Sequence, residues 1–371
     1  MKTHFLPLHF RPLLVLVSIG VFFSCSEDEI ENPVEQNVII EESINNWKPM
    51  SLGMGGDVLA LLEYENELIA AGSFAHANEQ LVNGIAKWNG SSWQPLGASA
   101  YGVYRTLAEY NGKLVAGGYI SEEQGNPGNG VVVWDGTSWQ PLGSGIENVN
   151  NDYAASVNAL AVYNGDLIAG GAFNRAGGKT AHNIARWDGT EWHTLSLGMD
   201  FEVNALIAAH GILLAGGRFT TAGGVDAKRV AVWDGTQWKR VGEGWNSVIN
   251  AFTLLNDDIY AGGNDTRGSV AKWNGNAWEF LGSGTKEYIN ALTVWDGELI
   301  AGGDYPYTLG EGTNHIARWN GVKWTKLGDG VNSSIRALVP FEEELIAGGT
   351  FTVAGEHTAN RIAAWTKPLN P

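Results

Sequence analysis

Aromatic side chains recur in this sequence at a similar distance from a repeated Gly-Gly pair, which places them in one type of loop. Six lie 14 to 18 residues before the second glycine of a pair, and two more follow such a pair; they are Tyr101, Tyr104, Tyr153, Phe201, Trp245 and Tyr288, with Tyr305 and Tyr307. Flat rings on a rigid rim suit the faces of sugar rings. We therefore expect ligand-binding residues in this set, beside some rings that are buried between sheets.

Trp245 is the expected centre of that site. It follows Val-Gly-Glu-Gly, where the other units place Ser, Ile, Thr or similar residues, and it has no hairpin partner. Tyr153 and Tyr288 belong to nearby units, and Arg105 or Arg336 could donate charge-assisted hydrogen bonds to a ligand. The sequence predicts that Trp245→Ala weakens glycan binding and changes stability little.

A second recurring set is polar and occupies the second residue of each expected inner strand. Its members are Asn158, Asn204, Asn250 and Asn290, with Arg105, Arg336 and Leu59 in the remaining units. Repetition around an axis would place them at the mouth of a central channel, where they could bind a polar ligand. Asparagines at the starts of closely spaced strands also bond to backbone, which is the preferred interpretation.

No catalytic or metal-binding constellation is visible. The histidines of the repeats lie singly, without His-Glu-x-x-His or paired spacing; they are His182, His193, His210, His315 and His357. We therefore predict no catalytic residue, no metal ligand and no cofactor, although calcium held by loop carbonyls would leave no sequence pattern.

A repeat must hold these residues in place. Alignment on Leu-Ile-Ala-Gly-Gly gives seven copies at spacings of 46, 53, 46, 46, 40 and 46, whose second glycines are Gly72, Gly118, Gly171, Gly217, Gly263, Gly303 and Gly349. Periods of this size indicate propellers or solenoids. The third unit contains four expected strands, at 157–163, 166–173, 183–189 and 190–195. The fold class is therefore all-β, with four-stranded antiparallel blades.

Tight turns are expected within each unit, at Asn164-Gly165 and Asp188-Gly189 in the third, since these dipeptides suit two-residue hairpins. The motif Trp-[Asp/Asn]-Gly-x-x-Trp then forms a hairpin tip. Its two tryptophans share one sheet face with either a two-residue or a four-residue loop, diagonally in the first case and directly opposite in the second. We assign these pairs, such as Trp134 and Trp139, to packing between blades.

The two ends of the repeat are complementary. The seventh unit has Trp365 on its third strand and no fourth-strand tryptophan, whereas 46–53 matches a fourth strand and precedes the first inner strand. The N-terminal segment should therefore complete the last blade and pair Trp47 with Trp365. This predicts a closed seven-bladed β-propeller over 46–371.

Function should lie on the face with the long loops, where second strands connect to third strands and blades connect to each other. Seven extra residues precede the third inner strand, and six are missing after Gly263. A longer loop beside a shorter one makes an uneven rim, where a pocket would form.

The N-terminus indicates export. Lys2 and Arg11 precede an apolar run at 13–23 that is too short to span a bilayer, so 1–24 is a predicted signal peptide. Cys25 is the single cysteine, which excludes an internal disulfide. Residues 25–45 form an acidic tether. The whole chain carries a net charge of −17, which makes nucleic acid and anionic lipid surfaces unsuitable partners.

Two family resemblances follow from these motifs. The order of inner strand, Gly-Gly strand, Trp-Asp-Gly strand and outer strand resembles the Kelch-type propeller of the galactose-oxidase superfamily, with Trp-Asp or Trp-Asn where Kelch units usually carry Tyr-Asp. The repeats are also similar to those of large surface proteins, including fungal cell-polarity markers. The segment Phe-Phe-Ser-Cys followed by Ser-Glu-Asp-Glu-Ile-Glu resembles a lipoprotein signal of Bacteroidetes-type bacteria. This implies lipidation at Cys25, an outer-membrane anchor and exposure at the cell surface.

The predicted function is a non-catalytic surface lipoprotein that binds a glycan or protein through its long-loop face. Two alternatives stay open, namely a hydrolase or lyase acting on polysaccharide and a structural module of an envelope complex. Galactose-oxidase chemistry is discounted, because its Tyr-Cys centre needs a cysteine inside the propeller. A sialidase-like arginine triad is also disfavoured, since Arg186 and Arg318 lie on expected outer strands.

Overall fold

The computed structural model describes residues 46–367 except 98–101, 150–153, 283–287 and 305–311. These residues belong to a compact unit, Ser43–Pro371, that is separate from Met1–Glu42. The unit is all-β apart from one short 3-10 helix, η1 (Glu122–Gln124). In the part of the chain that is described, no helix has the length and apolarity needed to cross a membrane.

Four-stranded antiparallel sheets make up the unit, and we number them 1 to 7 in the chain order of their first strands. The first, innermost strands are β2 (Val58–Tyr64), β8 (Val103–Tyr110), β13 (Ser156–Tyr163), β19 (Val203–Ala209), β25 (Ile249–Leu255), β29 (Ile289–Trp295) and β33 (Ile335–Phe341). The second strands are β3 (Glu67–Gly72), β9 (Lys113–Tyr119), β14 (Asp166–Ala172), β20 (Ile212–Gly217), β26 (Asp258–Gly263), β30 (Glu298–Gly303) and β34 (Glu344–Gly349).

The third and fourth strands carry the paired tryptophans. The third strands are β6 (Ile85–Trp88), β10 (Val131–Trp134), β17 (Ile184–Trp187), β23 (Val230–Trp233), β27 (Val270–Trp273), β31 (Ile316–Trp319) and β37 (Ile362–Thr366). The fourth strands are β7 (Trp93–Pro95), β11 (Trp139–Pro141), β18 (Trp192–Thr194), β24 (Trp238–Arg240), β28 (Trp278–Phe280) and β32 (Trp324–Lys326), with β1 (Trp47–Pro49) in sheet 7. The N-terminal strand therefore pairs with the last strand of the chain, Trp47 opposite Trp365.

We call the segment that connects the fourth strand of one sheet to the first strand of the next sheet a link. Small hairpins cover several of these links. They are β4 (His76–Ala77) with β5 (Gln80–Leu81), β15 (Arg175–Ala176) with β16 (Lys179–Thr180) and β12 (Ile146–Glu147), β21 (Thr221–Ala222) with β22 (Val225–Asp226), and β35 (Val353–Ala354) with β36 (His357–Thr358). Each two-stranded hairpin lies between the second and third strands of its sheet, whereas β12 lies between the fourth strand of sheet 2 and the first strand of sheet 3. Sheet 5 has only residues 264–269 at this place.

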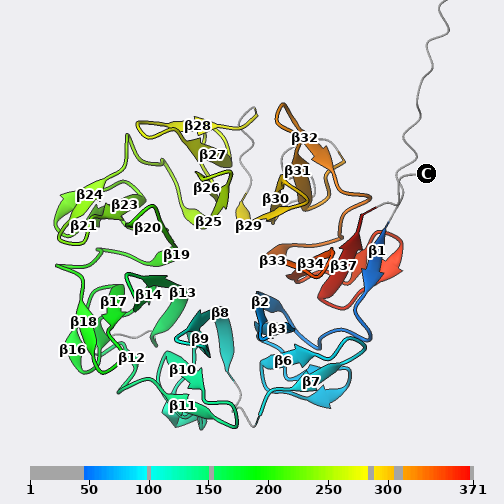
Figure 1. The fold of residues 1–371 in the computed structure, drawn as a ribbon, viewed down its shortest axis with the longest axis horizontal. Helices are drawn as coiled ribbons and strands as arrows, with labels where there is room; N and C mark the ends of the chain where they lie inside the picture. The colour runs from blue at the N-terminus through cyan, green and yellow to red at the C-terminus, as the bar shows by residue number, and fades with distance from the viewer. Residues whose placement is uncertain (1–45, 98–101, 150–153, 283–287, 305–311, 368–371) are drawn as a thin grey trace, which may run out of the picture. The chain divides into compact units, whose positions relative to one another are not determined.

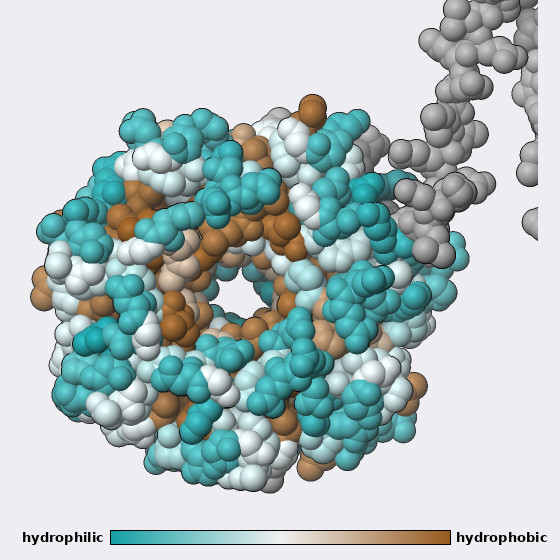
Figure 2. Space-filling view, viewed as in Figure 1, coloured by the Kyte–Doolittle hydropathy of each residue, from teal (hydrophilic) through white to brown (hydrophobic). Residues whose placement is uncertain are grey.

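The sheets are arranged radially around a central opening, with their first strands innermost (Figures 1 and 2). Each first strand contacts the first strand of the next sheet, and β33 of sheet 7 also contacts β2 of sheet 1. The core consists of the layers between neighbouring sheets, filled by residues such as Ile69, Leu114 and Ile335.

The Gly-Gly pair is explained by two close approaches. A Cβ on the second glycine, Gly171 for example, would lie 1.9 Å from the carbonyl oxygen of Ser156 on the adjacent strand. A Cβ on the first glycine would meet a β-branched side chain of the next sheet, as Gly170 would meet Val203 at 2.6 Å. Gly348 of sheet 7 would meet Val58 of sheet 1 at 2.5 Å. The glycines thus let strands and neighbouring sheets pack closely.

The tryptophan pairs pack as predicted and also connect sheets by hydrogen bonds. Trp134 lies directly opposite Trp139, with ring centroids 5.5 Å apart. The Trp139 indole N–H donates to the carbonyl oxygen of Leu96 in the preceding sheet at 3.0 Å. Trp47 does the same to Leu327 at 3.1 Å. Each pair therefore contributes apolar burial, and the fourth-strand indole adds a bond between sheets everywhere except in sheet 5, where the Trp278 N–H has no hydrogen-bond partner among the described residues.

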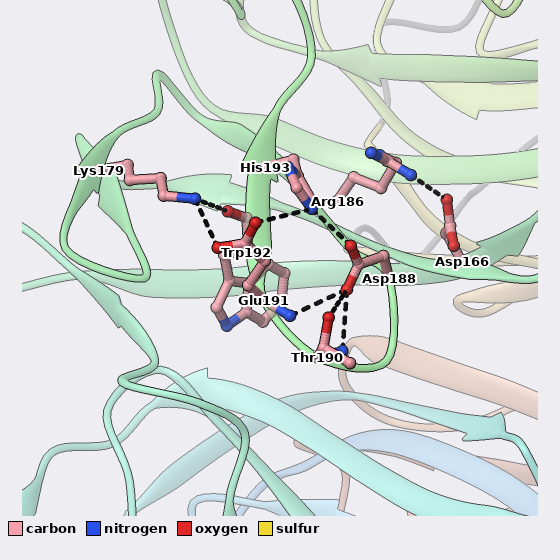
Figure 3. A network of polar contacts seen from close by, with 8 residues as sticks. All are labelled: Asp166, Lys179, Arg186, Asp188, Thr190, Glu191, Trp192 and His193. Atoms are coloured by element: carbon pink, nitrogen blue, oxygen red, sulfur yellow. Dashed lines mark hydrogen bonds and ion pairs between the residues drawn. The ribbon is translucent and has the colours of Figure 1, made fainter.

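The two turn predictions have different outcomes. Asn164-Gly165 forms a two-residue turn, because Tyr163 pairs with Asp166 and both turn residues have positive φ. Asp188-Gly189 does not, because Trp187 pairs with Trp192 across a four-residue loop. The Asp188 carboxylate accepts hydrogen bonds from the backbone N–H groups of Thr190 and Glu191, which closes this longer loop (Figure 3).

Candidate functional site

The predicted channel residues all lie at irregularities of the first strands. In each sheet the register with the second strand shifts at this residue, which is Leu59, Arg105, Asn158, Asn204, Asn250, Asn290 or Arg336. A β-bulge leaves one residue without a ladder partner. The repeated polar position in the sequence is therefore the bulge position of the fold.

Side-chain hydrogen bonds connect these asparagines around the channel. Asn158 donates to the Asn204 Oδ1 at 3.4 Å, and Asn204 donates to the Asn250 Oδ1 at 3.1 Å. Asn250 and Asn290 donate to backbone oxygens of the next sheet, at Ile289 (3.1 Å) and Ile335 (3.2 Å). The side-chain amides of these asparagines thus form hydrogen bonds from one sheet to the next. This agrees with the interpretation that they have a structural role.

The two channel arginines have different surroundings. The Arg336 Nη1 lies 3.1 Å from the Asp304 Oδ1, so its charge is compensated. Arg105 is exposed, but the walls of the central channel surround it and reduce its contact with water. This desolvation is the main cause that lowers the pKa of Arg105. The positive charge of Arg336 lowers it further, and the negative charge of Glu202 opposes the shift.

Trp245 is not an exposed platform, which corrects the prediction for this residue. Its side chain is 2% exposed, and its ring centroid lies 5.3 Å from that of Phe280 and 6.0 Å from that of Trp278. A ring buried among other rings has no free face on which a sugar could stack. Trp245 belongs to the core between sheets 4 and 5.

The missing residues of sheet 5 explain this burial. Four other links place a smaller apolar residue at the same point, where it bridges the small hairpin of the next sheet; they are Met54, Ile146, Met199 and Val331. Sheet 5 lacks the hairpin, and the large ring of Trp245 fills the space. Asp265, which is 0% exposed, stands where sheet 1 has the buried Phe74. The Arg267 guanidinium binds both Asp265 oxygens at 2.9 and 2.8 Å.

Tyr104 is also a core residue and not a ligand platform. It is 1% exposed, and its hydroxyl donates to the Asn126 Oδ1 at 2.9 Å. Burial raises the pKa of Tyr104. The lipidation residue Cys25 and four predicted rim residues, Tyr101, Tyr153, Tyr305 and Tyr307, lie outside the described residues.

Phe201 is the predicted aromatic residue that the structure exposes most clearly. It is 55% exposed and stands between two hollows on the long-loop face. We name the first, of about 560 Å³, the amide hollow; it is lined by Tyr119, Asn148, Ala154, Ala172, Phe173, Asn174, His182, Asn183, Asp200, Phe201 and Glu202. We name the second, of about 430 Å³, the arginine hollow; it is lined by Asp200, Phe201, Arg218, Thr220, Arg229, Ser247, Val248 and Tyr288.

The structure thus brings Phe201 and Tyr288 together and adds three residues that the sequence reasoning missed. Tyr119, 40% exposed, lines the amide hollow, and Arg218 and Arg229 line the other. Tyr119 and Arg218 each directly follow the second glycine of a unit, and Arg229 directly precedes a third strand. Alignment of those two positions across the repeats would have found them.

Carboxylates of these hollows are largely engaged within the protein. The Asp200 oxygens accept hydrogen bonds from the backbone N–H groups of Thr220 and Thr221 and from the Thr220 hydroxyl. Burial alone would raise the pKa of Asp200, but these bonds outweigh it and lower the pKa. The Glu202 Oε2 lies 3.8 Å from the Arg218 Nε and, among the described residues, has no hydrogen-bond donor.

The hollows contain hydrogen-bonding groups and aromatic rings but no metal site. Among the described residues, no three His, Cys, Asp or Glu side chains are close enough together to hold an ion. The rings and polar groups of the two linings can stack on a ligand and form hydrogen bonds with it.

No protein-family model and no curated protein matches this sequence. Solved structures do resemble the chain. The WD40 β-propeller domain of Doa1 is 11% identical, with a TM-score of 0.57 over 88% of this chain and 98% of that one. The extracellular domain of a putative hybrid two-component system from B. thetaiotaomicron is 10% identical, with a TM-score of 0.58 over 88% of this chain and 40% of that one.

The computationally designed Ika8 protein is 17% identical, with a TM-score of 0.53 over 86% of this chain and all of that one. At such identities the likeness concerns the fold alone. The fold is a β-propeller built from four-stranded antiparallel sheets.

Proposed function

We propose that this protein is a non-catalytic cell-surface lipoprotein whose β-propeller binds a glycan through the long-loop face. The observation that carries the proposal is the exposed ring of Phe201 between two hollows, with Tyr119 lining one and Tyr288 lining the other. Sugar rings present apolar faces that stack on aromatic side chains, and their hydroxyls can form hydrogen bonds with polar residues of the two linings.

A glycan is favoured over a protein partner by the dimensions of the site. Hollows of about 430 and 560 Å³ lie in the size range of small-ligand pockets, whereas protein interfaces bury wide surfaces. Phe201 and Tyr119 are exposed rings in a lining that also contains polar residues such as Asn148 and Asp200. Protein binding remains the second candidate from the sequence.

We also propose that the scaffold is a closed propeller of seven blades, with β1 completing the last blade. Support comes from the pairing of Trp47 with Trp365, from the contact of β33 with β2, and from the approach of Gly348 to Val58. A closed ring has no exposed sheet edge and therefore holds the rim loops in fixed positions. The Kelch-type resemblance stays a resemblance.

The surface location rests on the N-terminal sequence. The signal at 1–24, Cys25 and the acidic tether support export and lipidation, and a propeller neighbour is an extracellular domain of a Bacteroides protein. If Cys25 carries the anchor, Cys25→Ala releases the protein from the outer-membrane fraction. A variant that still fractionates with the outer membrane would refute the lipoprotein assignment.

A glycan array probed with the chain from Ser26 onward tests the binding function. Phe201→Ala should lower affinity for every bound glycan by about 1 to 3 kcal/mol, by analogy with aromatic stacking on flat ligands. Leu197→Ala is a matched control, since Leu197 is an exposed apolar residue of the same unit that lines neither hollow. Equal binding by both variants would place the site elsewhere, and cleavage of a bound glycan would favour the enzyme alternative.

A further inference from the structure

Two arginines occupy the same place in different sheets and have different neighbours. Arg229 in sheet 4 and Arg361 in sheet 7 each accept a backbone hydrogen bond from the second glycine of their unit, Gly217 and Gly349. Both have positive φ, 76° and 68°. The two arginines therefore have equivalent backbone positions. Any difference between them comes from the side chains of neighbouring residues.

The next sheet compensates one arginine and not the other. The Arg361 Nε lies 3.5 Å from the Oδ1 of Asp57, the residue directly before the first strand of sheet 1. The corresponding residue before the first strand of sheet 5 is Val248, which is apolar. Among the described residues, no carboxylate lies within ion-pair distance of Arg229.

Arg218 adds a second cation to the same hollow. Its side chain is 59% exposed, and its partner Glu202 is 3.8 Å away, beyond hydrogen-bond distance. Within the described part of the chain, Arg229 donates one hydrogen bond, from Nη1 to the backbone oxygen of Arg218. A guanidinium has five N–H donors, so most donors of this pair face the hollow or solvent. Asp200, the carboxylate in the lining, already accepts three bonds.

We propose that the arginine hollow binds the carboxylate of an acidic sugar, of the uronic acid class, as one unit of an oligosaccharide. Arg218 and Arg229 donate to the carboxylate, and Phe201 stacks on the sugar ring. The adjoining unit lies in the amide hollow, beside the partly exposed ring of Tyr119. This inference rests on the proposed glycan-binding function.

A carboxylate fits better than a densely charged polyanion. The planar fork of arginine matches the two oxygens of a carboxylate. The hollow of about 430 Å³ suits a single sugar ring. The chain as a whole carries a net charge of −17, which repels ligands with closely spaced negative charges. Isolated carboxylates along an otherwise neutral glycan avoid that repulsion.

The test is an array of glycan pairs, each uronic acid glycan beside its carboxyl-reduced form, with sulfated glycans as a third set and the chain from Ser26 onward as the probe. We expect carboxyl reduction to lower affinity about tenfold or more, the usual effect of losing hydrogen bonds to a charged group. Arg229→Asn and Arg218→Ala should each lower the affinity for the acidic glycan to a similar extent. The affinity for the carboxyl-reduced glycan should not change. Asn183 holds the Arg229 position in sheet 3 at positive φ, so the Asn variant retains the backbone.

Arg361→Asn is the matched control, because its arginine lies outside both hollows. It should bind the acidic glycan like the unmodified protein. Equal binding of both members of a pair, or an Arg229→Asn protein that folds and binds normally, would overturn the inference while the glycan-binding function stands. A preference for sulfated glycans would refute the proposal that the ligand group is a carboxylate. No glycan bound at all would refute the proposed function itself.

Discussion

The link from sheet 7 to sheet 1 and the link from sheet 4 to sheet 5 follow the same backbone path but are covered differently. Met54 donates its N–H to Asn360, and Trp245 donates its N–H to Lys228, both at 2.9 Å. Met54 then bridges Ala77 in a small hairpin that covers the first link. The second link has no such hairpin, and Trp245 packs on Trp278 and Phe280 instead.

This difference shows how a repeat obtains an irregular site without changing its frame. Loss of six residues after Gly263 removes the cover, and one large ring restores the buried part of the packing. The indole of Trp93 still bonds to Met50 at 3.3 Å at the first link, whereas the Trp278 indole has no hydrogen-bond partner among the described residues. Val248, whose carbonyl oxygen accepts a hydrogen bond from the Asn264 N–H of the shortened loop, lines the arginine hollow.

Deletion of 46–53 should have the largest effect, because it removes β1 and the chain that leads into the first link. Trp365 then loses Trp47, and β37 presents an unpaired edge. Loss of one buried tryptophan alone costs about 3–5 kcal/mol, against a total stability of about 5–15 kcal/mol. We expect the shortened protein to aggregate or to melt far lower by circular dichroism.

A protein that begins at Asn46 is the control for this deletion, since it loses the tether and keeps β1. Its melting temperature should equal that of the longer chain. An unchanged melting temperature after deletion of 46–53 would instead argue for an open array of sheets.

Trp245→Ala tests whether the ring has replaced the hairpin at the second link. Removal of this buried side chain should lower the free energy of unfolding by about 3–5 kcal/mol, measured by urea denaturation. Met54→Ala at the first link should cost about 2–5 kcal/mol. A Trp245→Ala protein of normal stability with reduced glycan affinity would contradict the buried role and restore the ring as a platform.

Sequence reasoning predicted the frame well because the frame repeats. The glycine pairs, the paired tryptophans and the match of 46–53 to a fourth strand indicated four-stranded sheets, and the structure has them. The failure at Trp245 came from treating it as an exception to the hairpin pattern. Alignment with Met54, Ile146, Met199 and Val331 would have placed it in a buried apolar series.

The arginine hollow was harder to predict than the frame. Its lining comes from sheet 4 and from the residues before two further first strands, and Arg229 matters because Val248, in the next unit, is not an acid. The site depends on Arg229 having no carboxylate near it in the folded protein. The sequence repeat does not show which residues of different units lie near each other. The uneven rim did indicate the face, since the hollow lies beside the shortened loop.

Asp265→Asn should have a smaller effect at the second link, and one that depends on pH. Burial would raise the pKa of Asp265, but hydrogen bonds from Arg267 and Asn246 outweigh burial and lower it. The carboxylate therefore stabilises the fold above the unfolded pKa of about 3.9, and this contribution is lost as the pH falls through the lower folded value. The variant should lose about 1–3 kcal/mol at neutral pH. Urea denaturation at about pH 7 and pH 3 should show the gap to the unmodified protein narrowing in acid; a constant gap would mean that the charge of Asp265 contributes nothing.

The smallest change makes the first link resemble the second in charge alone. Asp57→Asn removes the partner of Arg361, and because this ion pair is partly exposed, the free energy of unfolding should fall by only about 0–1 kcal/mol. The freed arginine should not create a second acidic-sugar site, because the hairpin of β4 and β5 still covers the link. In an Asp57→Asn, Arg229→Asn double variant the original site is removed, so titration with the acidic glycan measures binding at the first link alone. Restored affinity in the double variant would show that an uncompensated arginine suffices, whereas affinity as low as that of Arg229→Asn alone would show that the open hollow is also required.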